Sequence, residues 1–182
     1  MHHPRLATFM VDGKTHYGLV AENGIVDLSA RFGKSYPTLR EVIADGALLR
    51  VAEDSARLKP DFASDAITWQ PPIPAPEKII CIGVNYPDRN AEYKDGQAAP
   101  PYPSMFMRTP RSFVGHETPL VRPRASAQLD YEGEVVIVIG KAGRHISEAN
   151  ALEHIAALTL CNEGTIRDWS RHAKFNVTQG KN

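Results

Sequence analysis

The segment from Trp69 to Pro76 constrains the fold of this chain more than any other, because residues 71–76 hold four prolines in six positions. A proline fixes its own φ and has no backbone N–H, so a run of prolines continues neither a helix nor a central strand. Proline-rich chain is stiff and extended instead. We therefore expect a linker at residues 71–76, a small module at 1–70 before it and a larger domain at 77–182 after it.

Two turn signals organise the strands of the small module. Asp12-Gly13 separates two strand-like stretches, residues 6–11 and 15–20, and an Asp-Gly pair supplies the positive φ that a tight hairpin needs. A second turn at Asn23-Gly24 leads to the apolar residues 25–28. The pattern therefore predicts a three-stranded meander.

Helical patterns follow the predicted meander. Residues 37–43 carry Pro37 in what would be the first turn, a position that proline favours, and residues 48–58 form a second amphipathic candidate. Together with the strands they make residues 1–70 a small α+β module. We expect this module to pack or to act as a lid, and to carry no chemistry.

The larger domain alternates apolar strands with short helical or looped inserts. Residues 135–139 lack any polar alternation, which predicts a strand covered on both faces. Ser147 is a candidate N-cap for a helix over residues 148–157, and residues 158–161 would return as a strand. Periodicity alone indicates an α+β fold class.

Composition excludes several classes of protein. Acidic and basic residues are equal in number, 21 each, whereas nucleic-acid binding needs a net basic surface. We therefore expect no nucleic-acid partner.

The chain has no secretory apolar stretch near its start and nowhere 18 consecutive apolar residues, so no membrane segment is predicted. Cys81 and Cys161 both fall in predicted strands, which favours core thiols in a reducing compartment over a disulfide, and hence a cytoplasmic protein.

Three carboxylates lie at the borders of apolar stretches. Glu132 and Glu134 precede the strand at 135–139, and Glu163 follows the strand at 158–161. Residues two apart on a strand share one face and lie about 6–7 Å apart, so two such glutamates repel by roughly 2–3 kcal/mol at an effective dielectric near 20. A divalent cation would reverse the sign of that interaction. An isolated Glu-x-Glu pair is more often exposed to solvent than bound to a metal. These residues alone therefore do not identify a metal site.

Five landmarks follow the linker in a fixed order. They are Gly83-Val84-Asn85-Tyr86, the aromatic strand at 105–110, Asp130-Tyr131-Glu132-Gly133-Glu134, the segment from Asn162 to Asp168, and Gln179-Gly180-Lys181. From residue 76 to 182, and more weakly before it, the chain resembles the fumarylacetoacetate hydrolase family. The resemblance implies a mixed, rolled β-sheet in the catalytic domain. Relatives continue well past the Gly-Lys pair, so we expect this catalytic domain to be incomplete at its C-terminus.

The resemblance implies a metal site at the three acidic positions. In the family these positions hold one Mg²⁺ or Mn²⁺, which here points to Glu132, Glu134 and Glu163 as the ligands. Metal–oxygen distances longer than those of Mg²⁺ would indicate Ca²⁺. Most members carry Asp at the third position. Glu163 is one methylene longer, so the oxygen chemistry is kept while the geometry is expected to differ.

The family also implies a reaction class. Its substrates are 2-oxo or β-dicarbonyl acids, and a metal-polarised carbonyl leads to an enolate that is common to C–C hydrolysis, tautomerisation and decarboxylation. Many relatives carry a water-activating histidine where this chain has Arg89, and arginine keeps its proton. We therefore predict an isomerase or tautomerase of a hydroxymuconate or 2-hydroxydienedioate type of aromatic catabolite. A C–C hydrolase or a decarboxylase is the alternative, and a non-catalytic binding or assembly subunit is the alternative of another class.

Further site residues are predicted from the same landmarks. Arg89 and Glu92 are three positions apart on a predicted helix, where their side chains can pair. Either they bind a substrate carboxylate and act as catalytic residues, or they form an ordinary surface ion pair. Lys181 is the candidate acid/base or counter-charge. Arg108 and Tyr86 are expected to bind substrate.

Other ionisable residues carry weaker arguments. His116 has a possible role as a substitute base, although an exposed turn histidine is the more common case. Arg167 and Asp168 are expected to form a structural pair behind Glu163. Three further histidines look like solvated helix or loop residues, namely His145, His154 and His172.

The sequence also predicts self-association. The apolar strand at 135–139 would lack cover if the sheet stops near residue 182, and exposed apolar edges either pair or aggregate. Family members associate through this domain. A homodimer joined through residues 77–182 is therefore expected.

Overall fold

A computed structural model describes residues 3–83, 85, 102–172 and 177–181. The chain divides into two compact units, which are described separately. The first contains residues 1–74, 114–120 and 133–162, and the second contains residues 75–113, 121–132 and 163–182. The structure confirms the α+β fold class. The domain boundaries predicted from the sequence stay a prediction.

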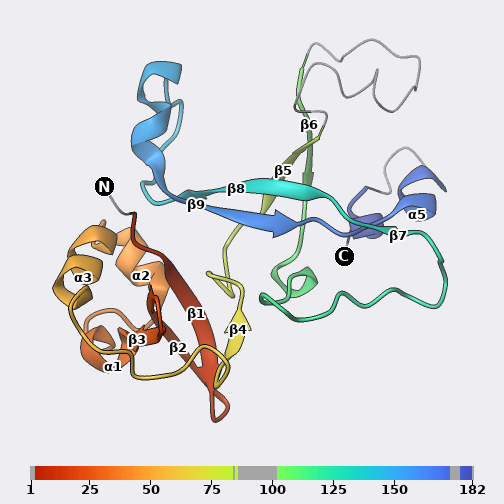
Figure 1. The fold of residues 1–182 in the computed structure, drawn as a ribbon. Coiled ribbons are helices and arrows are strands. Elements are labelled where there is room, and N and C mark those ends of the chain that lie inside the picture. The colour runs from red at the N-terminus through yellow and green to blue at the C-terminus, as the bar shows by residue number, and fades with distance from the viewer. Residues whose placement is uncertain (1–2, 84, 86–101, 173–176, 182) are drawn as a thin grey trace. The chain divides into compact units, whose positions relative to one another are not determined.

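A four-stranded antiparallel sheet with the order β3-β2-β1-β4 begins the first unit (Figure 1). Its strands are β1 (Leu6–Val11), β2 (Lys14–Ala21), β3 (Gly24–Asp27) and β4 (Thr68–Gln70). The predicted turn lies between β1 and β2, with φ of 48° at Asp12 and 74° at Gly13. The sequence predicted three of these strands, and β4 adds the fourth by pairing Phe9 with Trp69.

Three short helices cover this sheet and enclose its core. They are α1 (Ser29–Phe32), α2 (Leu39–Ala44) and α3 (Leu48–Ser55). Helix α2 begins after Thr38, whose hydroxyl accepts from the Arg40 N–H while Glu41 reaches back to the Thr38 backbone. This capping box places the helix start two residues after the predicted one. The core contains Tyr17, Val26, Leu28, Val42 and Val51.

A long antiparallel hairpin completes the first unit. It joins β8 (Gly133–Ile139) to β9 (Ile155–Asn162), with Val135 opposite Leu160 and Ile137 opposite Leu158. The prediction of a strand covered on both faces was wrong. Val138 packs against the core, but Val135, Ile137 and Ile139 are 54–68% exposed, because successive side chains of a strand point to opposite faces.

The connection within this hairpin also differs from the prediction. Residues 148–157 were expected to form one helix, but a 3-10 helix, η2 (Glu148–His154), ends where β9 begins. Among the described residues Ser147 makes no capping hydrogen bond, and Ile155 and Ala157 pair with β8 instead, on either side of a bulge. His154 is buried rather than solvated, with Nδ1 at 2.8 Å from the Lys141 carbonyl oxygen.

The second unit is assembled from short paired strands. Strand β5 (Ile80–Gly83) pairs with β6 (Ser104–Met107), and β7 (Leu129–Asp130) pairs with β10 (Thr165–Ile166). The helical segments are η1 (Pro110–Ser112), α5 (Arg167–His172) and η3 (Gln179–Lys181). In the described structure Cys81 and Cys161 are half-buried and form no disulfide. Of the helices that the structure describes, none has the length and apolar character to cross a bilayer.

Candidate metal and catalytic site

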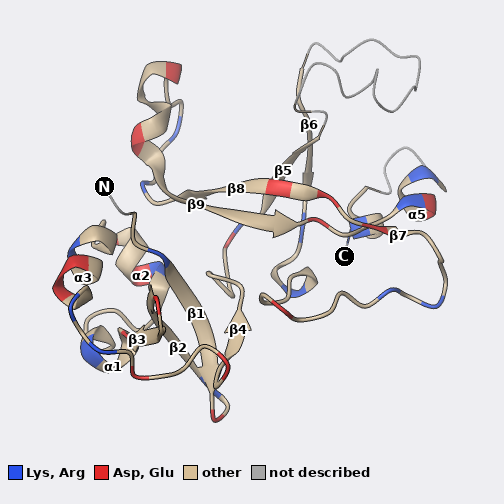
Figure 2. Ribbon diagram, in the orientation of Figure 1, with Lys and Arg blue, Asp and Glu red and all other residues tan. Residues whose placement is uncertain are grey.

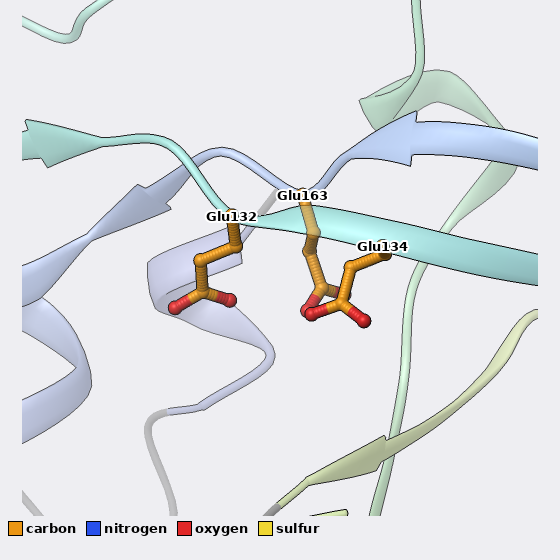
Figure 3. A group of neighbouring side chains, drawn as sticks. All are labelled: Glu132, Glu134 and Glu163. Carbon is orange, nitrogen blue, oxygen red and sulfur yellow. The ribbon is translucent and has the colours of Figure 1, made fainter. Parts of the chain in front are cut away.

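The end of the β8–β9 hairpin brings the three predicted carboxylates together. Gly133 pairs with Asn162, and the Glu163 N–H donates to the Glu132 carbonyl at 2.7 Å, so Glu163 lies beside the Glu-x-Glu pair. One carboxylate oxygen from each glutamate lies within 4.8 Å of the other two, and all three side chains point to the same side (Figure 3). Glu163 is buried, Glu132 is half-buried and Glu134 is exposed. Their role as metal ligands stays a prediction.

Lys181 reaches two of these carboxylates from η3. Its Nζ lies 2.6 Å from Glu132 Oε2, 2.9 Å from Glu163 Oε2 and 2.8 Å from Thr165 Oγ1. An ammonium has three N–H donors, so these contacts use all of them. The side chain is only 7% exposed and Nζ lies 5.2 Å from the centre of the Phe106 ring. The structure thus places a fixed, buried cation between two acids.

Arg167 binds the other oxygen of Glu132. Its Nη1 contacts Glu132 Oε1, and its Nε donates to Asp130 Oδ2 at 2.9 Å. The predicted pair of Arg167 with Asp168 was wrong, since Asp168 accepts from Ser126 Oγ at 2.7 Å. Adjacent residues in a helical turn do not face each other, so both side chains find partners elsewhere. Figure 2 shows acidic residues at β7 and the start of β8, and basic ones on α5.

Arg108, a predicted substrate residue, is buried beside Glu163. Its Nε donates to Ser112 Oγ at 3.1 Å, and its guanidinium carbon lies 4.7 Å from the centre of the Phe113 ring. Nη1 lies 3.7 Å from Glu163 Oε1, too far for a hydrogen bond. Within the part of the chain that the structure describes, this nitrogen is buried without a hydrogen-bond partner. Such a donor is costly to bury unless an acceptor reaches it.

The surroundings shift two pKa values in opposite directions. Burial opposes the charge on Glu132, but the hydrogen bond and charge of Lys181, with the charge of Arg167, outweigh it and hold the pKa of Glu132 below its ordinary value. Burial, together with a hydrogen bond to Glu163, raises the pKa of the Cys81 thiol to about 12. Glu132 is therefore a carboxylate and Cys81 a neutral thiol at neutral pH.

The donor set fits a hard divalent cation. Three carboxylates with an exposed member supply the oxygen ligands that Mg²⁺, Mn²⁺ and Ca²⁺ prefer. The ionised side chains of the cluster are unequal in number. The acids are Asp130, Glu132, Glu134 and Glu163, and the bases are Arg108, Arg167 and Lys181. The cluster therefore carries an excess negative charge that a cation would neutralise.

Other predicted residues lie either away from this cluster or outside the part of the chain that the structure describes. Tyr86, Arg89 and Glu92 lie outside the described residues. The His116 side chain is 75% exposed and its ring lies 6.2 Å from that of Trp69, in agreement with the exposed-turn alternative. Two of the remaining histidines are exposed as predicted, namely His145 and His172.

Sequence reasoning missed the part played by Thr165. Its side chain is almost fully buried and contacts Lys181, although no role was predicted for it. The signal was its position, because it lies two residues after Glu163 inside one of the five landmarks.

Known proteins resemble the chain over most of its length. The model of the fumarylacetoacetate (FAA) hydrolase C-terminal family matches residues 78–182. A mitochondrial oxaloacetate tautomerase of Homo sapiens is 33% identical over 159 residues, which cover 85% of this chain and 50% of the relative. The oxaloacetate tautomerase YisK of Bacillus subtilis is 41% identical over 119 residues, 64% of this chain and 40% of the relative. The chain thus spans about half the length of the curated relatives it matches.

A solved structure shares the fold. Maleylpyruvate hydrolase from Sphingobium, crystallised with manganese(II) and pyruvate, superposes with a TM-score of 0.72 at 22% identity. The match covers 97% of this chain and 63% of that one. At this identity the likeness establishes the fold alone.

Proposed function

Because the chain belongs to the fumarylacetoacetate hydrolase family, we propose that it is a divalent-metal-dependent enzyme that interconverts the enol and keto forms of a 2-oxo dicarboxylic acid such as oxaloacetate. The observation that carries the proposal is the carboxylate cluster with Lys181 fixed between Glu132 and Glu163. The names of the human and Bacillus relatives, both oxaloacetate tautomerases, support the reaction.

Glu132, Glu134 and Glu163 would hold the cation, Mg²⁺ or Mn²⁺. When bound, the ion supplies a Lewis acid for the substrate carbonyl. Arg167 and Asp130 keep Glu132 oriented, since Arg167 joins both carboxylates. The manganese in the structurally similar maleylpyruvate hydrolase supports a divalent ion.

Arg108 binds a carboxylate of the acid in this proposal. Its Nη1 is a buried donor that lacks an acceptor among the described residues, and a carboxylate oxygen is its best partner because the hydrogen bond is charge-assisted. Ser112 and Phe113 hold the guanidinium in place. A dicarboxylic acid would therefore bind more tightly than a monocarboxylic one.

Lys181 handles the proton. Ketonisation requires one proton to reach C3 while the enol oxygen loses its own. The Lys181 ammonium, held by three contacts, gives its proton to C3 when the substrate replaces one of the three acceptors, and the resulting amine takes up the enol proton. In the reverse direction the neutral amine takes the C3 proton back. C–C hydrolysis is the weaker candidate, because it needs a base for water and Arg89 keeps its proton.

The experiment follows the loss of enol-oxaloacetate absorbance with purified protein in Mg²⁺, Mn²⁺ and EDTA. We expect a metal-dependent rate that Glu134→Gln lowers at least about a hundredfold. Glu153→Gln is the matched control, because Glu153 is an exposed partner of Lys141. An unchanged rate in EDTA, or full activity of Glu134→Gln, would refute the proposal. Efficient hydrolysis of acylpyruvates would favour the hydrolase instead.

We also propose that the protein is a cytoplasmic homodimer. The exposed apolar face of the β8–β9 hairpin is formed by Val135, Ile137, Ile139, Leu158 and Leu160. A second copy is the simplest cover for such a face. Light scattering after size exclusion should give twice the mass of the chain, and Ile137→Lys should give the monomer. A wild-type monomer of 20.1 kDa would contradict the proposal. Fractionation of cells tests the location.

A further inference from the structure

We infer that Thr165 is a positioning residue that orients the Lys181 ammonium for proton transfer, an inference that rests on the proposed function. Thr165 belongs to β10 and is 1% exposed. Its Oγ1 donates to the Glu163 carbonyl oxygen at 3.1 Å and accepts from Lys181 Nζ at 2.8 Å. The hydroxyl therefore links Lys181 to the backbone of a predicted metal ligand.

The hydroxyl has a fixed direction. Its single proton is engaged by the Glu163 carbonyl, so a lone pair rather than the proton faces Lys181. The group that meets this lone pair must therefore be a hydrogen-bond donor, as a lysine ammonium is. A valine of the same shape would leave one buried N–H of Lys181 without an acceptor.

Thr165 is the neutral member of the three anchors of Lys181. Glu132 and Glu163 accept charge-assisted hydrogen bonds from the ammonium, whereas Thr165 offers the oxygen of a neutral hydroxyl. The hydrogen bond to Thr165 is a third contact, and the three together fix the rotation of the ammonium about its Cε–Nζ bond. Because these contacts use all three N–H groups, the substrate receives a proton only when it replaces one of the acceptors, and Thr165 holds the ammonium in place during that exchange.

The chain around Thr165 is rigid enough to set such a direction. Thr165 pairs with Asp130 across β10 and β7, and Asp130 in turn binds Arg167. Gly180 brings η3 close to this strand, since an added Cβ would lie 3.0 Å from the Ser170 nitrogen and 3.2 Å from the Ile166 oxygen. Close packing at Gly180 thus fixes the base of the Lys181 side chain, and Thr165 fixes its end.

The kinetic test compares Thr165→Val with Thr165→Ser. The valine variant should lower kcat for enol–keto interconversion on the order of tenfold, while KM changes less than about twofold, because substrate binding does not involve the hydroxyl. The serine variant keeps the hydroxyl and should recover most of kcat. Thr159→Val, on β9, is the control for the loss of a threonine hydroxyl elsewhere. Equal kcat in Thr165→Val and wild type, or no recovery with serine, would overturn the inference.

A second measurement does not depend on turnover. NMR of lysine ¹⁵Nζ groups detects ammonium protons that exchange slowly because they are buried and hydrogen-bonded. The Lys181 signal should be present in the wild type and in Thr165→Ser and lost in Thr165→Val, with Mn²⁺ affinity by calorimetry unchanged within about threefold. An unaltered Lys181 signal in Thr165→Val would overturn the inference. If the NMR pattern holds but the wild type shows no turnover, the anchoring of Lys181 by Thr165 stands and the proposed function fails.

Discussion

The core of the N-terminal sheet and the cluster around Lys181 are buried in opposite ways. The largest fully buried side chains of residues 1–55 are almost all apolar, among them Tyr17, Phe9, Ile25, Leu28 and Val42. Among the described residues from 102 onward the buried side chains are mostly polar or charged, namely Arg108, Ser126, His154, Glu163, Thr165 and Lys181. Apolar burial is favourable by itself, whereas a buried charge is tolerated only when partners replace water.

The two kinds of burial predict different effects of substitutions in the core and in the cluster. The N-terminal core requires no partner beyond close packing, so it is consistent with the packing role expected of that module. The Lys181 cluster depends on its neighbours, because the buried charges of Lys181 and Glu163 are each paired with an opposite charge. We therefore expect substitutions in the core to alter stability alone, and substitutions in the cluster to alter stability and binding together.

The largest effect is expected for Glu163→Gln. It leaves the buried cations Lys181 and Arg108 without the charge of their shared partner, which should lower the free energy of unfolding by roughly 3–5 kcal/mol. It also removes a predicted ligand, so calorimetry should show no Mn²⁺ binding. Urea denaturation measures the first effect.

The exposed Glu153→Gln serves as the control, since removing a surface ion pair should change stability by no more than about 0.5 kcal/mol. If Glu163→Gln is as stable as this control, the buried charges are not interdependent. The expected difference between the cluster and the apolar core would then be refuted.

The next effect is expected for Leu28→Ala, in the apolar core. Leu28 is fully buried, and truncation of such a leucine costs about 2–5 kcal/mol through lost burial and the cavity left behind. Mn²⁺ affinity, measured at a temperature where the variant is folded, should stay within about twofold of the wild type. A parallel loss of stability and Mn²⁺ affinity would show that the two regions do not act independently.

A smaller effect is expected in acid, at the cluster. The pKa of Glu132 is lower in the folded protein than its ordinary value near 4.3. Its contribution to stability is therefore complete above about pH 4.3 and lost as the pH falls through the lower folded value. Carboxyl ¹³C NMR should show Glu132 titrating below the ordinary glutamate value of about 4.3. A pKa of Glu132 above that ordinary value would contradict the assignment of Lys181 and Arg167 as its partners.

The stability of the apolar core is expected to depend on pH in the opposite direction, because a contribution from Tyr17 is lost at high pH. Burial, followed by the charges of Asp27 and Glu41, raises the pKa of Tyr17 to about 12. Neutral Tyr17 therefore stabilises the fold fully below about pH 10, and this contribution is lost as the pH rises toward 12. The difference in absorbance at 295 nm between wild type and Tyr17→Phe should titrate near that value. A difference that titrates near pH 10, the ordinary tyrosine value, would show that Tyr17 is not buried.

Features encoded within a few residues could be predicted from the sequence. The Asp12-Gly13 turn follows from the positive φ that its residues tolerate. A helix at residues 37–43 was predicted from Pro37, although the capping box of Thr38 and Glu41 starts α2 two residues later. The three glutamates were found because each lies at the end of an apolar strand, and strand ends that pair bring such residues together.

Features that depend on distant partners could not be predicted. Lys181 is 49 positions from Glu132, and Arg167 prefers Asp130 and Glu132 to its neighbour Asp168. Residues 155–157 form a strand because β8 offers hydrogen bonds that a helix pattern does not reveal. The sequence by itself therefore determined the family, the turns and the candidate ligands. Only the tertiary structure decided which cation meets which carboxylate, because pairing at long range depends on how the backbone is packed and not on local preference.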